Sequence, residues 1–459
     1  MWGRVGGGSA PASGPYSCGG DAVSGEEDRS EARSSSGNVS PDTPNRGKER
    51  TPSAVRVALA VASGAALFWN LLGYPLLLVL LARRRGPFRF RRDRRIGSVT
   101  VLIAAHNEEV VIGGRVRNLE AQQTERKMEI IVISDGSTDA TAERARAAGA
   151  IVVEQDRAGK VAALEKGVEL SRGEAIVITD ANTVFEPDVV EALVDRLEDE
   201  RVGIAAGDLR YSNAEESASS AGESLYWRYE TFLKRAASDA GLLLMGAGGV
   251  YGVRKEDYPR GIPHDLADDS FVPLSLHRRR RWNVFVPEAV ARERAGSRMG
   301  EEWRRRVRMV AQDVRVARAL DWGAPRPATV FALFSQKVLR WLLLPIGSVF
   351  AVSIAPDLRR VARSRMSAAA GSAVSILFLT PSRRRRTARL LGIGAYALGA
   401  LTAAFLGFCR GMVGISPAVW EKAETTRGGG RFPQSTGMPA ECLEGALPEC
   451  NSSGRNTRN

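Results

Sequence analysis

The sequence contains few of the residues from which zinc centres and disulfide frameworks are built. Its 459 residues include four cysteines and three histidines. Three cysteines lie in polar tails and the fourth, Cys409, ends an apolar run; none belongs to a CxxC pair or has a histidine nearby. These counts argue against a disulfide scaffold and against a histidine-rich metal site. A metal bound by this chain is therefore expected to be a hard cation on oxygen ligands.

Lysine is also scarce, since it supplies eight of the 65 basic residues. The formal net charge is +13, but arginine-rich runs at 83–95, 278–281 and 383–386 contribute +7, +4 and +4, so the remaining chain is slightly acidic. Such an uneven distribution argues against a nucleic-acid partner. Two of the runs border long apolar stretches, which is typical of the cytoplasmic side of membrane spans.

Two tails have the composition of disordered chain. Residues 1–52 and 424–459 are rich in Gly, Ser and Pro with mixed charge, and they lack apolar periodicity. Because they offer too little apolar surface to offset the entropy of ordering, we expect both to be disordered. The length of the chain predicts two or three structural units.

A membrane helix is predicted at Val57–Leu81, a stretch of 25 residues without a charge. A buried core helix is the alternative, but eight arginines follow at once and favour a span whose carboxyl end is cytoplasmic. The N-terminus would then face outside, and the chain that follows the span would lie inside.

Apolar segments return over residues 328–408. Ala328–Arg340 predicts a helix in the membrane interface, and Leu390–Phe408 is long enough to span. Trp341–Ala355 and Ala368–Thr380, of 15 and 13 residues, are short for separate spans, and the arginines between them would face outside if both crossed. The number of C-terminal spans stays open.

Residues 98–313 predict an α/β domain with a mostly parallel sheet and helices on both faces. Near-continuous apolar runs of strand length alternate there with helical patterns. The expected strands are Val99–Ala105, Glu129–Ser134, Ala175–Thr179 and Val202–Ala206, and the expected helices are Thr138–Ala148, Lys160–Ser171 and Asp188–Glu200.

Polar side chains follow three of these strands, at the edge where open α/β sheets bind ligands. The segments are His106–Glu109, Asp135–Asp139 and Asp180–Asn182. Taken alone, Asp135–Asp139 is also explained by a turn followed by a helix cap. Asp180 and Asn182 project to the same side of an extended segment, so they predict oxygen ligands for one Mg²⁺ or Mn²⁺.

The ordered set of segments over residues 99–308 resembles the family 2 glycosyltransferases of GT-A fold. The segments are Ala104–Glu108, Ile133–Asp139, Gly159-Lys160, Ala163-Leu164, Thr179–Asn182, Gly246–Arg254, Asp268-Asp269 and Arg305–Arg308. The flanking Gln336–Trp341 and Trp420–Lys422 resemble the membrane-embedded members, which include cellulose, hyaluronan and poly-N-acetylglucosamine synthases.

The resemblance implies roles for the matched residues. Five of them would bind the nucleotide-sugar donor: His106, Glu108, Asp135, Lys160 and Asp180. Asp180 and Asn182 would hold one Mg²⁺ or Mn²⁺, which stabilises the charge on a diphosphate leaving group. Asp269 would deprotonate the acceptor hydroxyl, and Asp268 replaces the usual preceding glutamate. The alternative for both carboxylates is an ordinary helix N-terminus, which the helix dipole favours.

Two departures from the motifs of the resembled family bear on function. The second metal ligand is usually Asp, so Asn182 should weaken metal binding. The polymerising synthases carry Gln-x-x-Arg-Trp where this chain has Arg305-Arg306-Val-Arg308-Met309. Arg305, Arg306, Arg308 and Met309 are expected to contact the acceptor or product, while the changed motif leaves long-chain processivity open.

The expected protein is a membrane-bound, inverting, metal-dependent glycosyltransferase of hexosyltransferase type. It would move a sugar from a nucleotide-sugar, a UDP-sugar foremost, to a cell-envelope polysaccharide or glycolipid. It would be a multi-pass protein of the cell (inner) membrane with a cytoplasmic catalytic domain, and an accessory membrane subunit is a further candidate partner. Two alternatives stay open, namely transfer of a single sugar to a lipid acceptor and a non-catalytic membrane subunit that scaffolds an assembly.

Overall fold

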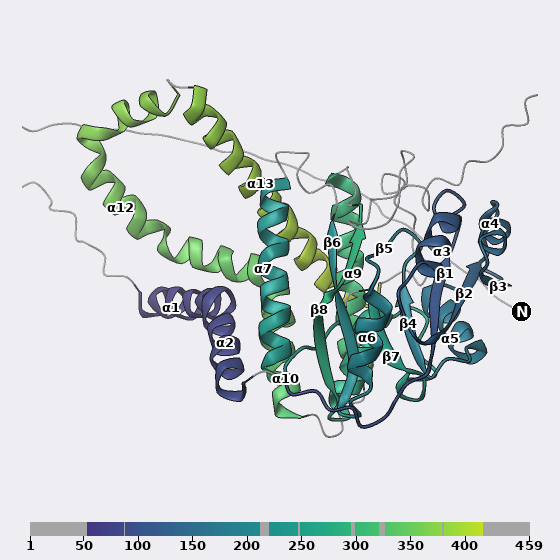
Figure 1. Ribbon diagram of the computed structural model, residues 1–459. Helices are drawn as coiled ribbons and strands as arrows, with labels where there is room; N and C mark the ends of the chain where they lie inside the picture. The colour runs from purple at the N-terminus through teal and green to yellow at the C-terminus, as the bar shows by residue number, and fades with distance from the viewer. Residues whose placement is uncertain are drawn as a thin grey trace, which may run out of the picture. The chain divides into compact units, whose positions relative to one another are not determined.

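The computed structural model describes residues 53–86, 88–211, 220–246, 248–294, 299–320, 326–378 and 381–415. Both tails whose composition predicts disorder, residues 1–52 and 424–459, lie outside these ranges. The described part consists of an α/β domain with further helices before and after it in the sequence (Figure 1).

An eight-stranded sheet forms the centre of the α/β domain, in the order β3-β2-β1-β4-β7-β6-β8-β5 (Figure 1). The strands are β1 (Ser98–Ala105), β2 (Lys127–Asp135), β3 (Ile151–Gln155), β4 (Ala175–Thr179), β5 (Val184–Phe185), β6 (Val202–Tyr211), β7 (Tyr251–Arg254) and β8 (Trp282–Glu293). Four neighbouring pairs are parallel, and three pairs, β4–β7, β6–β7 and β5–β8, are antiparallel. The sheet is therefore mixed. The predicted parallel arrangement is confirmed for β2-β1-β4, and β3 adds a further parallel strand that was not predicted.

The directions of the strands decide which residues meet. β4 and β6 both run antiparallel to β7, and β8 runs parallel to β6, so β1, β2, β4, β6 and β8 all end at one edge of the sheet. β7 starts at this same carboxyl edge, so the glycine-rich segment that precedes it also lies there.

Helices cover both faces of the sheet, as predicted. β1 shows the division, because Leu102 joins one apolar core while Val101 and Ile103 join the other. The first core receives side chains from α5 (Lys160–Leu170), α7 (Ser220–Asp239) and α8 (Asp268–Arg278), and the second from α3 (Ile112–Glu120), α4 (Thr141–Ala147) and α6 (Val189–Leu197).

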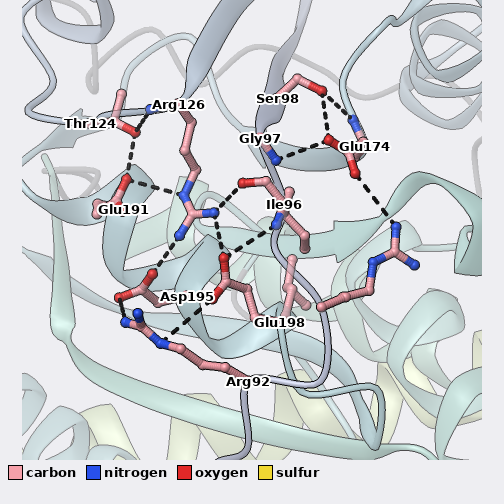
Figure 2. A network of polar contacts seen from close by, with 12 residues as sticks. Arg92, Ile96, Gly97, Ser98, Thr124, Arg126, Glu174, Glu191, Asp195 and Glu198 are labelled. Atoms are coloured by element: carbon pink, nitrogen blue, oxygen red, sulfur yellow. Dashed lines mark hydrogen bonds and ion pairs between the residues drawn. The ribbon is translucent and has the colours of Figure 1, made fainter.

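The amino ends of the strands are held by Arg126, which precedes β2 (Figure 2). Its guanidinium contacts Glu191 at 3.2 Å, Glu198 at 3.0 Å and Asp195 at 2.5 Å, and it also donates to the carbonyl oxygen of Ile96. The side chains of Arg126 and Glu198 are 7% and 5% exposed, so their ion pair is shielded from solvent, whereas Glu191 and Asp195 are partly exposed. The cluster ties α6 to the segment before β1, which is a structural role at the edge away from the polar strand ends.

The segment before the α/β domain is a candidate membrane span. It covers Ala54–Arg85 and comprises α1 (Ala54–Phe68), a π-helix (Trp69–Gly73) and α2 (Tyr74–Arg85). The helix predicted at Val57–Leu81 lies within it. Several large apolar side chains of this segment are exposed, as lipid-facing side chains would be: Val57, Leu59, Val61, Phe68, Leu72, Leu76 and Leu80.

The segment after the domain contains a second candidate span and a bent helix pair. The span is Gly394–Met412 within α13 (Pro381–Met412), and it overlaps the predicted Leu390–Phe408. The pair joins Pro327–Trp341 to Leu343–Arg360 at an angle of 65°. Over its described residues the chain thus has two candidate spans, or three if the bent pair is one span.

One expectation for this region is corrected. The sequence separates Trp341–Ala355 from Ala368–Thr380 by a group of arginines, but Leu343–Phe378 is a single 36-residue helix, α12. Arginine is a good helix former, so the change in polarity does not end the helix. Asp357 within this polar stretch forms an ion pair with Arg56 of α1 at 3.1 Å, so it balances part of the charge.

Two glycines bring α13 close to α9 (Met299–Ala319), the helix that carries the acceptor-like arginines. A Cβ atom at Gly407 would lie 2.6 Å from the carbonyl oxygen of Val307, and one at Gly411 would lie 2.7 Å from that of Ala311. Any larger residue would push the helices apart. The arginine-bearing helix is therefore fixed against a candidate membrane span.

Candidate active site

The polar ends of β1 and β2 meet at the carboxyl edge of the sheet. Nδ1 of His106 lies 2.8 Å from the carbonyl oxygen of Asp135, and Oδ1 of Asn107 accepts a hydrogen bond from the N–H of Thr138 at 2.8 Å. Asn107 has a φ of 53°, a left-handed conformation that asparagine tolerates better than most residues. The two strand ends are therefore joined into one loop pair.

Asp135 lies inside this loop pair and is 0% exposed. Its carboxylate accepts four hydrogen bonds, from Gln155 Nε2 at 2.9 Å, Arg157 Nη1 at 3.0 Å, and the N–H groups of Ala158 and Gly159 at 2.8 and 2.9 Å. These bonds fix the loop that leads into α5. The carboxylate thus orders the loop before α5, and its predicted contact with a nucleotide base stays a prediction.

Glu108 lies beneath the same loops. It is 2% exposed, and its N–H donates to Oγ1 of Thr141 at 2.7 Å. His106 is half-buried and is the more accessible of the two residues. Their predicted nucleotide contacts also stay predictions, and the geometry favours His106 over Glu108.

Lys160, the first residue of α5, connects three parts of the carboxyl edge. Its Nζ donates to Asp180 Oδ1 at 2.8 Å and to the carbonyl oxygen of Gly248 at 3.4 Å, and it lies 3.7 Å from Asp268 Oδ1. Burial opposes the charged amine, but the carboxylates of Asp180, Asp268 and Asp269 outweigh it and raise the pKa of Lys160. The Lys160 amine is therefore positively charged and lies beside Asp180, which is also predicted to bind the donor.

Asn182 follows Asp180 after β4, and its partner is a residue that the sequence did not single out. Its Nδ2 donates to Oε1 of Glu293, the last residue of β8, at 3.0 Å. Burial raises the pKa of Glu293 to about 7; the charge of Asp180 adds to the effect, and Arg305 opposes it. The predicted pair of metal ligands thus has a third oxygen-bearing neighbour.

Asp268 and Asp269 begin α8 and have different surroundings. Asp268 is 3% exposed, accepts a hydrogen bond from the Tyr251 hydroxyl at 2.9 Å and faces Lys160. Asp269 is half-buried and lies against Gly248, where a Cβ atom would come within 2.8 Å of its Oδ2. Burial, and then the charge of Asp268, raise the pKa of Asp269 to about 7. Asp269 can therefore exchange a proton near neutral pH.

Charged residues on two further helices also affect the pKa of Asp269. Asp313 of α9 raises its pKa, while Lys160 and Lys337 lower it. Lys337 Nζ donates to Asp313 Oδ2 at 3.2 Å. Lys337 belongs to a π-helix (Phe334–Val338) between α10 (Pro327–Leu333) and α11 (Leu339–Trp341). This π-helix interrupts the predicted interfacial helix Ala328–Arg340. The candidate base therefore lies next to a segment predicted to contact the membrane.

The four predicted acceptor residues lie on α9 and differ in their contacts and exposure. Arg305 and Arg306 both bind Glu302, at 2.9 and 3.3 Å, and Arg306 also donates to the Tyr396 hydroxyl of α13 at 3.1 Å. Arg308 is half-buried, and Met309 is 46% exposed. The charge of Arg305 acts on Glu293. The predicted contacts of all four residues with the acceptor or product stay predictions.

A buried arginine that was not predicted from the sequence supports the turn that follows β4 and contains Asp180 and Asn182, called the Asp180 turn below. Arg115 of α3 is 0% exposed, donates to Thr179 Oγ1 at 2.8 Å and stacks on the Phe185 ring at 4.1 Å. The Thr179 hydroxyl in turn donates to the carbonyl oxygen of Gly249 at 2.8 Å. An arginine on the inward face of α3 is the sequence signal that could have identified it.

The residues beside Asp180 fit a divalent cation. Asp180, Asn182 and Glu293 supply oxygen atoms, which Mg²⁺ and Mn²⁺ prefer. A Cβ atom at Gly249 would meet Oγ1 of Thr183 at 2.9 Å and Oδ2 of Asp180 at 3.4 Å, so the glycine leaves room there. The Thr183 hydroxyl is buried and has no hydrogen-bond partner among the described residues. No group of three His, Cys, Asp or Glu side chains suited to a metal occurs in the described ranges.

Comparison with known proteins agrees with this arrangement. Residues 100–259 match the model of the family described as Glycosyl transferase family 2. Poly-beta-1,6-N-acetyl-D-glucosamine synthase of Staphylococcus aureus (strain COL) is 26% identical over 220 residues, which cover 46% of this chain and 53% of that relative. The chain thus matches about half the length of the relative, and residues 100–259 form a glycosyl transferase family 2 domain.

A solved structure supports the fold. The mannosyltransferase PcManGT from Pyrobaculum calidifontis, in complex with GDP-Man and Mn²⁺, is 24% identical in sequence. The superposition covers 75% of this chain and 99% of that one, with a TM-score of 0.53. The GT-A type of α/β fold expected from the sequence is thereby confirmed.

Proposed function

We propose that this chain is a membrane-bound inverting glycosyltransferase that moves a sugar from a nucleotide-sugar, a UDP-sugar foremost, to a hydroxyl group of a cell-envelope glycan or glycolipid. The proposal rests on the positions of four charged residues at the carboxyl edge of the sheet. Lys160 and Asp180 form a pair at 2.8 Å, Asp268 is buried beside them, and Asp269 lies next to the glycine-rich segment with a raised pKa.

The donor diphosphate would lie against Lys160 and the Asp180 turn. The amine of Lys160 is positively charged and stands where negative charge develops on the leaving group. A bound Mg²⁺ or Mn²⁺ would supply Lewis-acid stabilisation of that charge. Arg115 holds Thr179, the residue before Asp180, so it keeps the turn in place. Gly248 and Gly249 allow the backbone to approach a ligand closely.

Asp269 would act as the general base in a single displacement. Its carboxylate takes the proton of the acceptor hydroxyl while the hydroxyl oxygen bonds to the anomeric carbon, and the bond from that carbon to the diphosphate breaks. Asp268 is the weaker candidate, because Tyr251 and Lys160 already occupy its oxygens. A pKa of about 7 suits a base that works near neutral pH.

The acceptor side is proposed to face the membrane. The candidate spans and the exposed apolar side chains of Ala54–Arg85 support membrane attachment, and the arginines that follow this span support a cytoplasmic catalytic domain in the cell (inner) membrane. Lys337 links the interfacial segment to Asp313 beside the base. Transfer of one sugar to a lipid is a second candidate function, favoured by Met309 where polymerising synthases carry Trp.

Product analysis separates these functions. The purified full-length chain would be incubated in lipid vesicles with Mn²⁺, a panel of labelled nucleotide-sugars and a membrane lipid extract as acceptor source. Release of nucleoside diphosphate together with labelled glycan supports the proposal. Long chains would mean polymerisation, and a single added sugar on lipid would mean the second candidate. No turnover of any donor would leave a non-catalytic membrane subunit as the better account.

A further inference from the structure

We infer that Glu293 supplies the second carboxylate of the divalent-cation site, in place of a carboxylate at position 182, and that Asn182 orients it. The inference rests on the proposed function, because it concerns the cation that would accompany the donor diphosphate. It makes Asn182 a partner of the site's second charge, whereas the sequence suggested only a weakened ligand.

Strand pairing places Glu293 at the site. β5 begins directly after the Asp180 turn and pairs antiparallel with the end of β8, with Val184 opposite Arg292 and Phe185 opposite Ala291. Continuing this register brings residue 293 to the turn that contains Asn182. The same edge is the carboxyl edge, because β8 runs parallel to β6 and β6 runs in the direction of β4. The meeting of Asn182 and Glu293 therefore follows from the topology of the sheet.

The hydrogen bond between these two side chains has a direction. The Asn182 amide nitrogen donates to Glu293 Oε1 at 3.0 Å. An amide offers two N–H donors and one acceptor oxygen, whereas a carboxylate accepts only. An Asp at position 182 would put two like charges in contact, which is unfavourable without a cation between them. Asparagine instead holds the Glu293 carboxylate in place, as outer partners of metal ligands commonly do.

The charge of the site is then distributed differently but is not reduced. Asp180 provides one carboxylate from β4 and Glu293 provides one from β8, so two negative charges remain for a divalent cation. Arg305 lies close enough to Glu293 for their charges to interact, and it comes from the adjacent α9. A purely structural role for Glu293, as an anchor for α9 through Arg305, is the competing explanation that an experiment must separate.

The test is Mn²⁺ binding to the full-length chain in detergent, measured by the electron paramagnetic resonance signal of free Mn²⁺ with saturating UDP and without sugar transfer. Glu293→Gln should weaken Mn²⁺ binding by at least about tenfold. The double variant Asn182→Asp with Glu293→Gln should bind Mn²⁺ within about threefold of wild type, because the carboxylate and the amide have exchanged places and the pair keeps one donor and one acceptor.

Two further variants keep the outcomes distinct. Glu288→Gln makes the same chemical change on the same strand at an exposed residue paired with Arg196, and it should leave Mn²⁺ binding unchanged. Asp180→Asn should abolish binding; unchanged binding in that variant would refute the proposed donor site itself. Loss of binding in Asp180→Asn with normal binding in Glu293→Gln would overturn only the present inference. A double variant as weak as Glu293→Gln, with an unchanged melting temperature, would also overturn it.

Discussion

Replacement of Asp269 by asparagine separates chemistry from binding. The side chain keeps its size, and Asp269 lies against Gly248, which has no side chain of its own. The donor contacts assigned to Lys160 and Asp180 are not touched by the change. Asp269→Asn should therefore bind nucleotide as wild type does while failing to accept the proton of the acceptor.

The expected loss of rate follows from the role of a general base. Such assistance typically contributes about 10²- to 10⁴-fold, which corresponds to about 3 to 5 kcal/mol in activation free energy. The substitution should lower the rate without lowering the stability of the fold. A carboxyl group whose folded pKa is raised from 3.8 to about 7 is proton-bound more tightly in the folded state, so its contribution to stability falls as pH rises through that interval. Asp269→Asn removes this penalty and should not lower the melting temperature at pH 8.

The assay pairs sugar transfer with UDP titration on the same folded preparation. Asp265→Asn is the matched control, because Asp265 makes an ion pair with Arg315 and has no proposed part in the reaction. Transfer by Asp269→Asn near the wild-type rate would refute the assignment of the base. A fall in melting temperature without a specific loss of transfer would mean that the two carboxylates only begin a helix.

Three further predictions concern pH, stability and topology. The value of kcat/KM should rise with pH through about 7 and then level, because Asp269 must be deprotonated to act; a profile that is flat from pH 6 to 8 would contradict this. Arg126→Met should destabilise the domain by about 3 kcal/mol, since the buried Glu198 loses its closest charge partner and keeps only Arg92 at 3.6 Å, whereas Arg146→Met at an exposed pair should cost less than about 1 kcal/mol; equal shifts in thermal unfolding would count against the network. A reporter fused after Leu320 should be active in the cytoplasm, and periplasmic activity would reverse the proposed orientation.

The sequence identified the central strands because their burial on both faces leaves a continuous apolar run. β1, β2 and β4 are nearly all buried, and their predicted ends differ from the observed ones by at most a few residues. β3 was missed because its five residues are half-exposed and include Glu154. β8 was missed because Pro287 and Glu288 interrupt its pattern, and the bulged pairing with β6 that accommodates them cannot be read locally.

The candidate site was predictable where residues follow a recognised strand. His106, Asp135, Lys160 and Asp180 all lie at the carboxyl edge, as expected from the parallel part of the sheet. Glu293 belongs to the same edge, but its place depends on the direction of β8 and on the β5–β8 pairing, which join residues distant in the sequence. The contrast between the two carboxylates of α8 also depends on distant partners, Tyr251 and Lys160.

Donor turnover by the wild-type chain and by Asp180→Asn tests the central claim most directly. Membranes containing either protein would be incubated with Mn²⁺ and a panel of radiolabelled nucleotide-sugars, and label in lipid and glycan fractions would be counted with the released nucleoside diphosphate. The account predicts that wild type transfers label from at least one donor and that Asp180→Asn, present at the same level, transfers none above background. Equal labelling by both proteins, or no release of nucleoside diphosphate by wild type from any donor, would contradict it.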